Sequence, residues 1–335
     1  MSKYISLNDK FLVAGATGMA GSSILRNLKL NHYGLNKYNG EIFCPSRKEL
    51  DLLNQKNVNE WFSYNKPTVV ILAAAKVGGI MANYKNPADF ILENLKIQNN
   101  IIEASWRFGI KRFLFLGSSC IYPKFANQPL IEEYLLTGEL EKTNDSYAIA
   151  KIAGIKLCDA LRRQYGFDAI SLMPTNLYGT NDNYTNNESH VFASLIRKFC
   201  EAKEYSFKKV TCWGTGSPMR EFMHVDDLGR AVVFALEKWN PSDKSAPLDK
   251  YGNPLTFLNV GTEREISIHE LALKISKETK YQGEIIWDSE MPDGTPRKKL
   301  SIEKISSLGW KPTIDLDEGI KQTVLEFKSK FLSKN

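Results

Sequence analysis

Tyr147 and Lys151 stand four residues apart, a spacing that places two side chains on one face of a helix. A free tyrosine, with a pKa of about 10, is a poor acid–base group at neutral pH. A neighbouring ammonium group stabilises the phenolate and lowers that pKa. The same lysine can also bond a cofactor ribose. The pair therefore predicts acid–base chemistry, although a tyrosine and a lysine at this spacing also occur on ordinary helix surfaces.

Three glycines, Gly15, Gly18 and Gly21, stand between an apolar strand pattern at 10–14 and a helical pattern that ends at Leu30. Glycines permit a tight turn, close approach of a pyrophosphate and close packing of helix on strand, while the helix N-terminus offers free N–H groups. A plain tight turn is the alternative. The strand–loop–helix context near the N-terminus favours dinucleotide binding.

The residues after the second predicted strand, 41–44, bear on the choice of cofactor. An acidic residue there would bond a ribose 2′-hydroxyl, whereas an arginine accommodates a 2′-phosphate. This chain has Arg47 and Lys48 at that place, which favours NADPH over NADH. A solvated basic loop is the alternative. Asp51 follows, placed either near the adenine or as a helix cap.

Ser118 and Ser119 follow the apolar segment 112–117. Ligands of parallel sheets bind beyond the carboxyl ends of the strands, where a serine hydroxyl can hydrogen-bond a substrate carbonyl. A serine-rich turn is the alternative. The glycine loop, the serines and the Tyr147–Lys151 pair come in the order typical of a reductase active site. We therefore expect Ser118, Tyr147 and Lys151 to act together.

Short apolar segments alternate with helical patterns in the first half of the chain. Strands are predicted at 10–14, 41–44, 68–73, 112–117 and 168–173, with helices at 22–30, 87–108 and 147–165 and an amphipathic stretch around Trp61. This pattern predicts an α/β fold, a doubly wound parallel sheet of Rossmann type with a second, smaller α/β substrate domain. We expect a dinucleotide-binding domain at 1–174, to which the chain returns near 212–240, and a mainly substrate-binding domain at 175–335. In that second part, loops are predicted at 179–189 and 240–254, and helices at 191–202 and 225–239.

The composition is that of an ordinary globular protein. The 335 residues are 43% hydrophobic and 24% charged, with a formal net charge of +6. The cations are scattered, so no nucleic-acid surface is expected, and no apolar run is long enough to span a membrane. Five cysteines without a C-x-x-C pair favour neither a disulfide scaffold nor a metal site, and the polar N-terminus does not resemble a signal peptide. We expect a cytoplasmic protein without a metal.

Long stretches of the chain resemble the GDP-L-fucose synthase family of extended short-chain dehydrogenases/reductases. The glycine spacing G-x-x-G-x-x-G is similar, and the resemblance runs from about residue 10 to 325. It is carried by residues 73–80, 116–124, 147–158, 173–179, 219–227 and 292–298. The resemblance implies inversion at C3 and C5 of GDP-4-keto-6-deoxy-D-mannose, followed by reduction at C4 with NADPH.

The resemblance also implies roles for further residues. Cys120 and His190 would be the acid–base pair of epimerisation, although Cys120 could be a buried hydrophobe and His190 a loop residue. Trp213 could stack on guanine or be a core aromatic, and Arg220 could bind phosphate or pair with Glu221 or Asp226. The substrate-binding set is Asn176, Lys198, Trp213, Arg220 and Lys298. The cofactor-binding set is Gly15, Thr17, Gly18, Met19, Gly21, Arg47, Asp51, Ala74, Lys151 and His190.

Two departures from the family pattern concern charge. Ala16-Thr17 stands in the glycine loop where the family often has an arginine, so an NADPH preference depends mainly on Arg47. Lys198 replaces an arginine at the substrate diphosphate, which keeps the charge but loses the bidentate fork.

Three other functions stay open. The chain could be a C4 reductase only, could act on a related GDP-4-keto sugar such as a GDP-deoxyheptose, or could be a non-catalytic dinucleotide sensor. The resemblance further implies a homodimer, built by packing the helices near 90–108 and 147–164 into a four-helix bundle.

Overall fold

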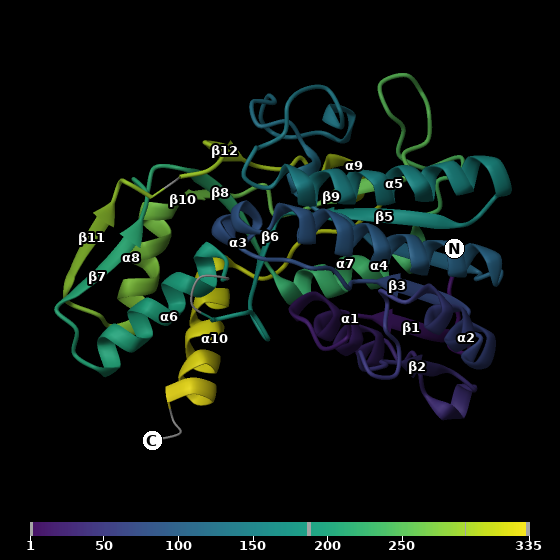
Figure 1. Cartoon of the computed structure of the whole chain (residues 1–335), viewed down its shortest axis with the longest axis horizontal. Helices are drawn as coiled ribbons and strands as arrows, with labels where there is room; N and C mark the ends of the chain where they lie inside the picture. The colour runs from purple at the N-terminus through teal and green to yellow at the C-terminus, as the bar shows by residue number, and fades with distance from the viewer. Residues whose placement is uncertain (1–2, 186–188, 292, 333–335) are drawn as a thin grey trace.

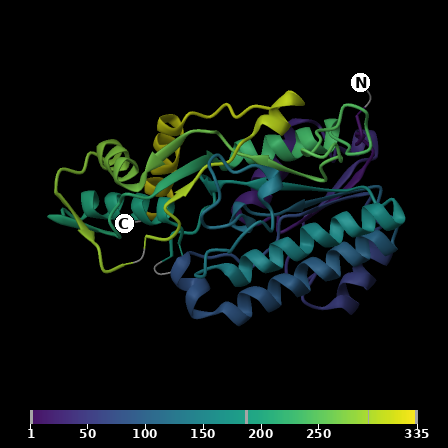
Figure 2. The same cartoon turned by 90° about the horizontal axis from the view of Figure 1, so that it is seen from above.

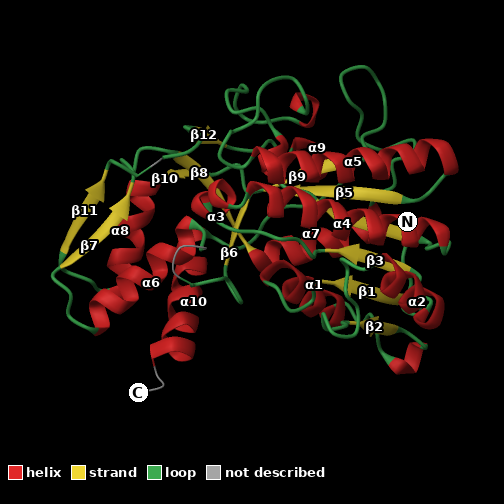
Figure 3. Cartoon of the chain, in the orientation of Figure 1, coloured by secondary structure: helices red, strands yellow, loops and turns green. Residues whose placement is uncertain are grey.

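Six parallel strands form the central sheet, in the order β2, β1, β3, β4, β5, β9 (Figures 1 and 3). A computed structural model describes residues 3–185, 189–291 and 293–332 of the chain. The strands are β1 (Lys10–Ala14), β2 (Glu41–Phe43), β3 (Val69–Leu72), β4 (Arg112–Leu116), β5 (Ala169–Pro174) and β9 (Phe257–Val260). The predicted parallel α/β sheet is confirmed. β9 is a sixth strand that the sequence pattern does not predict.

Helices cover both faces of this sheet. One face carries α1 (Met19–Leu30) and α7 (Val225–Lys238), and the other α2 (Gln55–Asn65), α4 (Pro87–Arg107) and α5 (Asp145–Tyr165). Alternate strand residues point to opposite faces, so Phe11 packs with α1 and α7 while Leu12 packs with the other layer. Cover on both sides explains why the central strands are continuous apolar runs. Figure 2 shows α4 and α5 side by side along the outer surface.

A second, smaller lobe is built around β8 (Met219–His224), visible to the left in Figures 1 and 3. β8 pairs in parallel with β6 (Asn176–Tyr178) and β12 (Arg297–Lys298), and antiparallel with β10 (Glu265–Ser267). β7 (Lys209–Trp213) and β11 (Glu284–Asp288) form a separate parallel pair. The lobe's helices are α6 (Val191–Glu204), α8 (Ile268–Thr279) and α10 (Leu316–Phe327), and its core is distinct from the two beside the large sheet.

The remaining elements are short. They are α3 (Ile80–Lys85), α9 (Glu303–Ser307), the 3₁₀ turns at Asn36–Tyr38, Ser119–Ile121 and Glu132–Tyr134, and a π-helical turn at Lys328–Leu332. Residues 186–188 of the predicted loop at 179–189, and Pro292 of the motif at 292–298, lie outside the described residues. Within the described ranges, no helix is long and apolar enough to cross a membrane.

Glu132 joins the segment after β4 to the edge strand β9. Its carboxylate accepts a hydrogen bond from the Asn259 backbone N–H at 2.8 Å, and Asn259 in turn accepts one from the Tyr122 hydroxyl at 2.6 Å. The side chain is buried without a cationic partner in hydrogen-bonding contact among the described residues. Burial and the neighbouring Glu133 raise the pKa of Glu132 to about 7, against hydrogen bonds and the more distant charge of Lys304.

We predict that Glu132→Gln weakens the pH dependence of stability between pH 5 and 8. A raised folded-state pKa means that the folded protein holds the proton more tightly, so stability falls as pH rises through about 7. This loss, about 2 to 3 kcal/mol, should be absent in the variant, because glutamine keeps the acceptor but cannot ionise. Denaturant unfolding at both pH values measures it, with the exposed Glu60→Gln as control. An unchanged pH dependence in Glu132→Gln would contradict the prediction.

Candidate active site

Ser118 follows the carboxyl end of β4. Its hydroxyl accepts a hydrogen bond from the Cys120 backbone N–H at 3.2 Å and so caps the short 3₁₀ turn at Ser119–Ile121. This turn directs the strand end toward the N-terminal part of α5. The serine is thus held at the sheet edge where ligands of this sheet type bind.

Lys151 fixes α5 against the end of β4. Its buried ammonium nitrogen donates to the Leu116 carbonyl oxygen at 2.8 Å and lies 4.8 Å from the centre of the Phe115 ring. The same nitrogen is 5.7 Å from the ring centre of Tyr147, one helical turn earlier. Tyr147 also hydrogen-bonds the Ser118 side chain. The structure therefore brings Ser118, Tyr147 and Lys151 together.

The protonation of this group differs from what the sequence predicts. Burial and the Cys120 charge raise the pKa of Tyr147, and the bond with Ser118 only partly opposes them. The expected lowering of this pKa by Lys151 is wrong for this structure, because desolvation dominates. Burial also lowers the pKa of Lys151 itself to about 7. Tyr147 therefore rests as a protonated phenol, a form that can donate a proton.

Cys120 is surrounded by hydrogen-bond donors. Its sulfur lies 3.4 Å from the Lys298 ammonium nitrogen and 3.4 Å from the Asn144 amide nitrogen. Burial raises the pKa of the Cys120 thiol, but the Lys298 charge and the bonds from Ser118, Lys298 and Asn144 outweigh it and lower the pKa below its usual value. Lys298 reaches this place because β12 pairs with β8 in the second lobe. The site therefore favours a thiolate.

His190 precedes the first turn of α6. The residue as a whole is exposed, while protein atoms surround its imidazole. The protein atoms around it and the Lys298 charge lower its pKa, so the ring is mostly neutral at neutral pH. Because Lys298 acts on both His190 and Cys120, all three belong to one electrostatic neighbourhood.

The glycine loop has the backbone geometry that its sequence predicts. Gly15 has φ +89°, and a Cβ there would lie 2.7 Å from the Ala74 backbone nitrogen at the end of β3. A Cβ at Gly21 would collide with the Gly15 carbonyl and the Ala16 backbone. Gly18 precedes α1 at its N-cap position, where no side chain caps the helix and the first turn holds no acid. Thr17 is exposed and Met19 half-buried. These residues fit a dinucleotide, because the first-turn N–H groups of a helix have no partner within the helix and can bind phosphate.

Arg47 is exposed beyond the carboxyl end of β2, which pairs in parallel with β1, the strand before the glycine loop. Asp51 does not cap α2, since the side chain of Asn54 does so by accepting from the Asn57 N–H at 3.1 Å. Asp51 instead accepts from the Leu53 N–H in its own turn. Of its two predicted places, only the one near the adenine stays open.

The predicted substrate residues lie in the second lobe at three places. Lys198 donates to the Thr211 carbonyl at 2.8 Å and lies 5.4 Å from the ring centre of Trp213, which is 45% exposed and open to stacking. Asn176 is tied to the Glu221 carbonyl at 2.8 Å. Of the predicted set, the structure brings Lys298 to Cys120 directly.

Arg220 does not form either ion pair that the sequence left open. Glu221 accepts backbone N–H groups instead, and Asp226 pairs with Arg26. Burial lowers the pKa of Arg220, while the charges of Asp293, Cys120 and Glu141 oppose that shift. The Arg220 guanidinium therefore interacts electrostatically with the Cys120 charge, and its hydrogen bonds go to the backbone carbonyls of Met219 and Asp293.

The structure adds residues that sequence reasoning misses. Cys120, Asn144 and Lys298 line a small cavity together with Glu141 and Lys124, which are paired at 2.8 Å. Asp293 accepts two hydrogen bonds from Thr215, beside Trp213. Nothing in the spacing of these residues along the chain signals that they meet.

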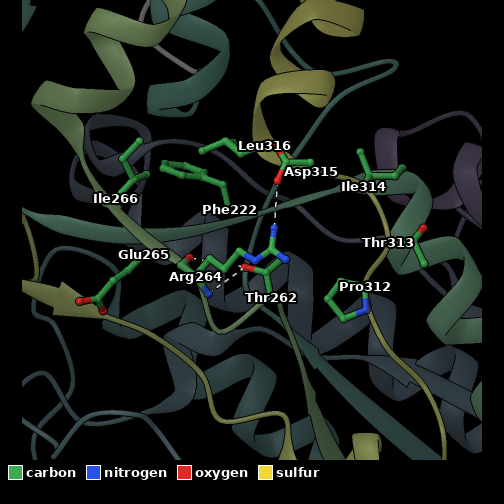
Figure 4. Close-up of a pocket in the computed structure, with 10 residues that line it drawn as sticks. All are labelled: Phe222, Thr262, Arg264, Glu265, Ile266, Pro312, Thr313, Ile314, Asp315 and Leu316. Carbon is green, nitrogen blue, oxygen red and sulfur yellow. Dashed lines mark hydrogen bonds and ion pairs between the residues drawn. The ribbon is translucent and has the colours of Figure 1, made fainter.

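A larger cavity lies elsewhere on the second lobe (Figure 4). Arg264 runs along it toward Asp315, with which it pairs at 2.9 Å, and Phe222 and Ile266 supply an apolar wall. None of the residues predicted for chemistry lines this cavity among those described. The candidate active site is therefore the smaller, polar cavity at the sheet edge.

Comparison with known proteins connects this geometry to a family. The family model for the NAD dependent epimerase/dehydratase family matches residues 11–246. GDP-L-fucose synthase 1 of Arabidopsis thaliana is 49% identical over 96% of this chain and 95% of its own length. A GDP-6-OMe-4-keto-L-xylo-heptose reductase from Campylobacter jejuni has a similar structure, with a TM-score of 0.87 and 36% identity over 97% of this chain and 99% of the other. MlghC, a GDP-mannoheptose C4 reductase from Campylobacter jejuni with NADP bound, gives a TM-score of 0.85 and 36% identity over 97% and 99%.

We predict that Gly15→Ala weakens NADPH binding at least about tenfold, because the methyl group strains a left-handed backbone and displaces Ala74. Fluorescence titration with NADPH measures the affinity. Gly109→Ala is the matched control, since Gly109 also has positive φ, +66°, but no atom within 4 Å of an added Cβ. The control should lose only about 1 kcal/mol of stability. Equal affinities of Gly15→Ala and Gly109→Ala for NADPH would count against a phosphate-binding role.

Proposed function

The chain belongs to the NAD dependent epimerase/dehydratase family, and we propose that it is an NADPH-dependent epimerase and reductase of a GDP-4-keto-6-deoxy sugar, of the GDP-L-fucose synthase type. One observation carries this proposal beyond the family. Cys120, whose sulfur contacts ammonium and amide donors, lies beside the Ser118–Tyr147–Lys151 group. A base that can remove a proton from carbon therefore lies next to the groups that can assist reduction of a ketone.

NADPH is the proposed cofactor. Gly15, Gly18 and Gly21 would receive the pyrophosphate, with Thr17, Met19 and Ala74 around it and Arg47 toward the 2′-phosphate. Lys151 retains donors for a ribose beyond the one used on Leu116. When bound, NADPH supplies the hydride for C4. The NADP found with the similar MlghC supports this choice.

The reductive half depends on Ser118 and Tyr147. The 4-keto oxygen gains negative charge as it is reduced, and the Ser118 hydroxyl and Tyr147 phenol are donors that stabilise it. Tyr147, whose pKa is raised, delivers its proton to that oxygen. The Lys151 ammonium then balances the phenolate, and the charge raises the proton affinity of that lysine again.

The epimerising half depends on Cys120 and His190. The 4-keto group acidifies the C–H bonds at C3 and C5, and the Cys120 thiolate removes a proton to leave an enolate. His190 returns a proton to the opposite face. Its ring is mostly neutral in the free protein, so the enolate's negative charge is needed to favour the imidazolium.

The second lobe would hold the GDP portion. Exposed Trp213 offers a stacking face for guanine, and Lys198 and Arg220 offer charge to the diphosphate. Asn176 begins β6 and His190 directly precedes α6. The test is product analysis by NMR after incubation with NADPH and GDP-4-keto-6-deoxy-D-mannose.

A second candidate function is C4 reduction only, on a GDP-heptose. The structural similarity to the two Campylobacter jejuni reductases favours it. A panel of GDP-4-keto sugars, with isotope exchange from solvent, separates the two. A non-catalytic sensor is disfavoured, because Tyr147 and Lys151 keep a working geometry.

We also propose a cytoplasmic homodimer. The five cysteines are unpaired, as suits a reducing compartment. The parallel run of α4 and α5 exposes Leu92 and Ile149, apolar residues that a second copy could cover by forming a four-helix bundle (Figure 2).

We predict that Tyr147→Phe lowers NADPH oxidation with a GDP-4-keto sugar at least about 100-fold, because the proton donor is lost. NADPH affinity should stay within about twofold, since the ring remains. Absorbance of NADPH measures the rate and fluorescence measures the binding. Tyr165→Phe, at the other end of the same helix, is the control. Wild-type turnover in Tyr147→Phe would remove Tyr147 from the mechanism.

We predict that Cys120→Ser and His190→Asn each lower deuterium incorporation at C3 and C5 at least about 100-fold in D₂O, because neither new side chain exchanges protons readily near neutral pH. Reduction of a ketosugar that needs no inversion should persist. NMR of substrate and product reads both, with the exposed Cys44→Ser as control. Exchange retained in both variants would refute this acid–base pair, and its absence from the wild type would favour the reductase-only function.

A further inference from the structure

We propose that Asn144 is a positioning residue for the epimerisation base. Its amide N–H stabilises Cys120 as a thiolate, and its carbonyl oxygen accepts a hydrogen bond from the thiol once the sulfur has taken a proton from the sugar. This inference rests on the proposed function, in which Cys120 is that base. The inference gives a role in epimerisation to Asn144, whose side chain contacts the Cys120 sulfur.

The first observation is where the Asn144 side chain goes. Asn144 occupies the position before the first turn of α5, where asparagine is among the preferred capping residues. Its side chain nevertheless makes no capping hydrogen bond. The amide nitrogen donates to the Cys120 sulfur at 3.4 Å instead, and the backbone N–H, bonded to the Glu141 carbonyl at 3.1 Å, fixes the base of the side chain.

The second observation is the free end of the same amide. The Asn144 carbonyl oxygen is buried without a hydrogen-bond partner among the described residues, and the residue lines the cavity with Cys120 and Lys298. Leaving a buried acceptor unpaired costs free energy. Since this oxygen holds no partner, the amide can turn over without breaking a bond at that end.

The third observation is the chemistry around the sulfur. Lys298 can only donate, so it suits a thiolate and not a thiol. The Ser118 hydroxyl already bonds the Cys120 backbone N–H, the Cys120 sulfur and Tyr147. After proton abstraction the new S–H needs an acceptor, and the Asn144 carbonyl oxygen becomes one when the amide turns. The residue thus serves both states of the base with one side chain.

The experiment measures the thiol of Cys120 directly, without relying on turnover. Iodoacetamide alkylation rates across pH, read by mass spectrometry of the Cys120 peptide, report its ionisation. A Cys44→Ser background removes the other thiol that is exposed, because Cys158, Cys200 and Cys212 are buried. The variants are Asn144→Ala, Asn144→Asp and Asn144→Ser, of which the last keeps a capping residue if the alanine variant folds poorly.

Asn144→Ala and Asn144→Ser should slow alkylation below neutral pH by about tenfold, the effect of losing one hydrogen bond to a charged group. Asn144→Asp should slow it by about 100-fold, since its carboxylate repels the thiolate and accepts from the thiol. Asn54→Ala, which removes the side-chain cap of α2, should leave the profile unchanged. In the unmutated-cysteine background, Asn144→Ala should lower exchange at C3 and C5 more than it lowers reduction.

An unchanged alkylation profile in Asn144→Ala and Asn144→Ser would overturn this inference, as would equal losses of exchange and reduction. Failure of the proposed function has a different signature, namely exchange retained in Cys120→Ser whatever the alkylation profile shows. Isotope exchange in Cys120→Ser therefore tests whether Cys120 is the base, and the alkylation profile of the Asn144 variants tests whether Asn144 assists it.

Discussion

The contact between the Lys298 ammonium and the Cys120 sulfur, at 3.4 Å, joins the two lobes and decides what their junction can do. A thiolate at a buried sheet edge is costly unless a cation compensates it. The large sheet does not supply that cation within hydrogen-bonding distance, since Lys151 is turned to the Leu116 carbonyl. It comes from β12, a strand of two residues that pairs with β8. The adjoining Lys299 is hydrogen-bonded to Gln128 and Leu130. The chemistry at Cys120 therefore depends on the second lobe being folded and docked.

The pKa values of neighbouring groups in this site are shifted in different directions, so the groups suit different steps of the reaction. Burial keeps Tyr147 protonated and brings Lys151 to a pKa of about 7, whereas donors around Cys120 favour its ionised form. Separating the pKa values of adjacent groups lets one site hold an acid and a base at the same pH. The negative sulfur also raises the pKa of Tyr147, so the thiolate helps to keep the phenol proton in place.

The sequence is informative where local rules decide the structure. The buried strands β3 and β4 are continuous apolar runs, and the Gly15 and Gly21 positions need glycine for reasons of space. The strand β9 is missed because Asn259 interrupts its apolar run. The buried amide of Asn259 is satisfied by hydrogen bonds with the Tyr122 hydroxyl and the Leu130 carbonyl, which lie far away in the sequence.

Long-range contacts account for the rest of what sequence reasoning misses. β12 consists of Arg297 and Lys298, which no periodicity marks as a strand. The raised pKa of Tyr147 and the contact of Asn144 with Cys120 depend on burial and on partners far along the chain. The sequence predicts that Tyr147 and Lys151 act as a pair. The protonation states of the two side chains follow from their burial, which only the folded structure shows.

The two halves of the proposed reaction differ in how much of the molecule they need. Ser118, Tyr147 and Lys151 are placed by β4 and α5 alone, within one contiguous stretch of the large sheet and its helix layer. Cys120 shares that stretch, but its ionisation needs Lys298 of β12, and His190 is carried by α6. Reduction is thus supported by the lobe common to dinucleotide-binding folds, while epimerisation depends on residues contributed by the second lobe. Loss of Lys298 from β12 or of His190 before α6 is therefore expected to remove epimerisation and to leave C4 reduction on the same fold. The chain is similar both to a GDP-L-fucose synthase and to GDP-heptose reductases.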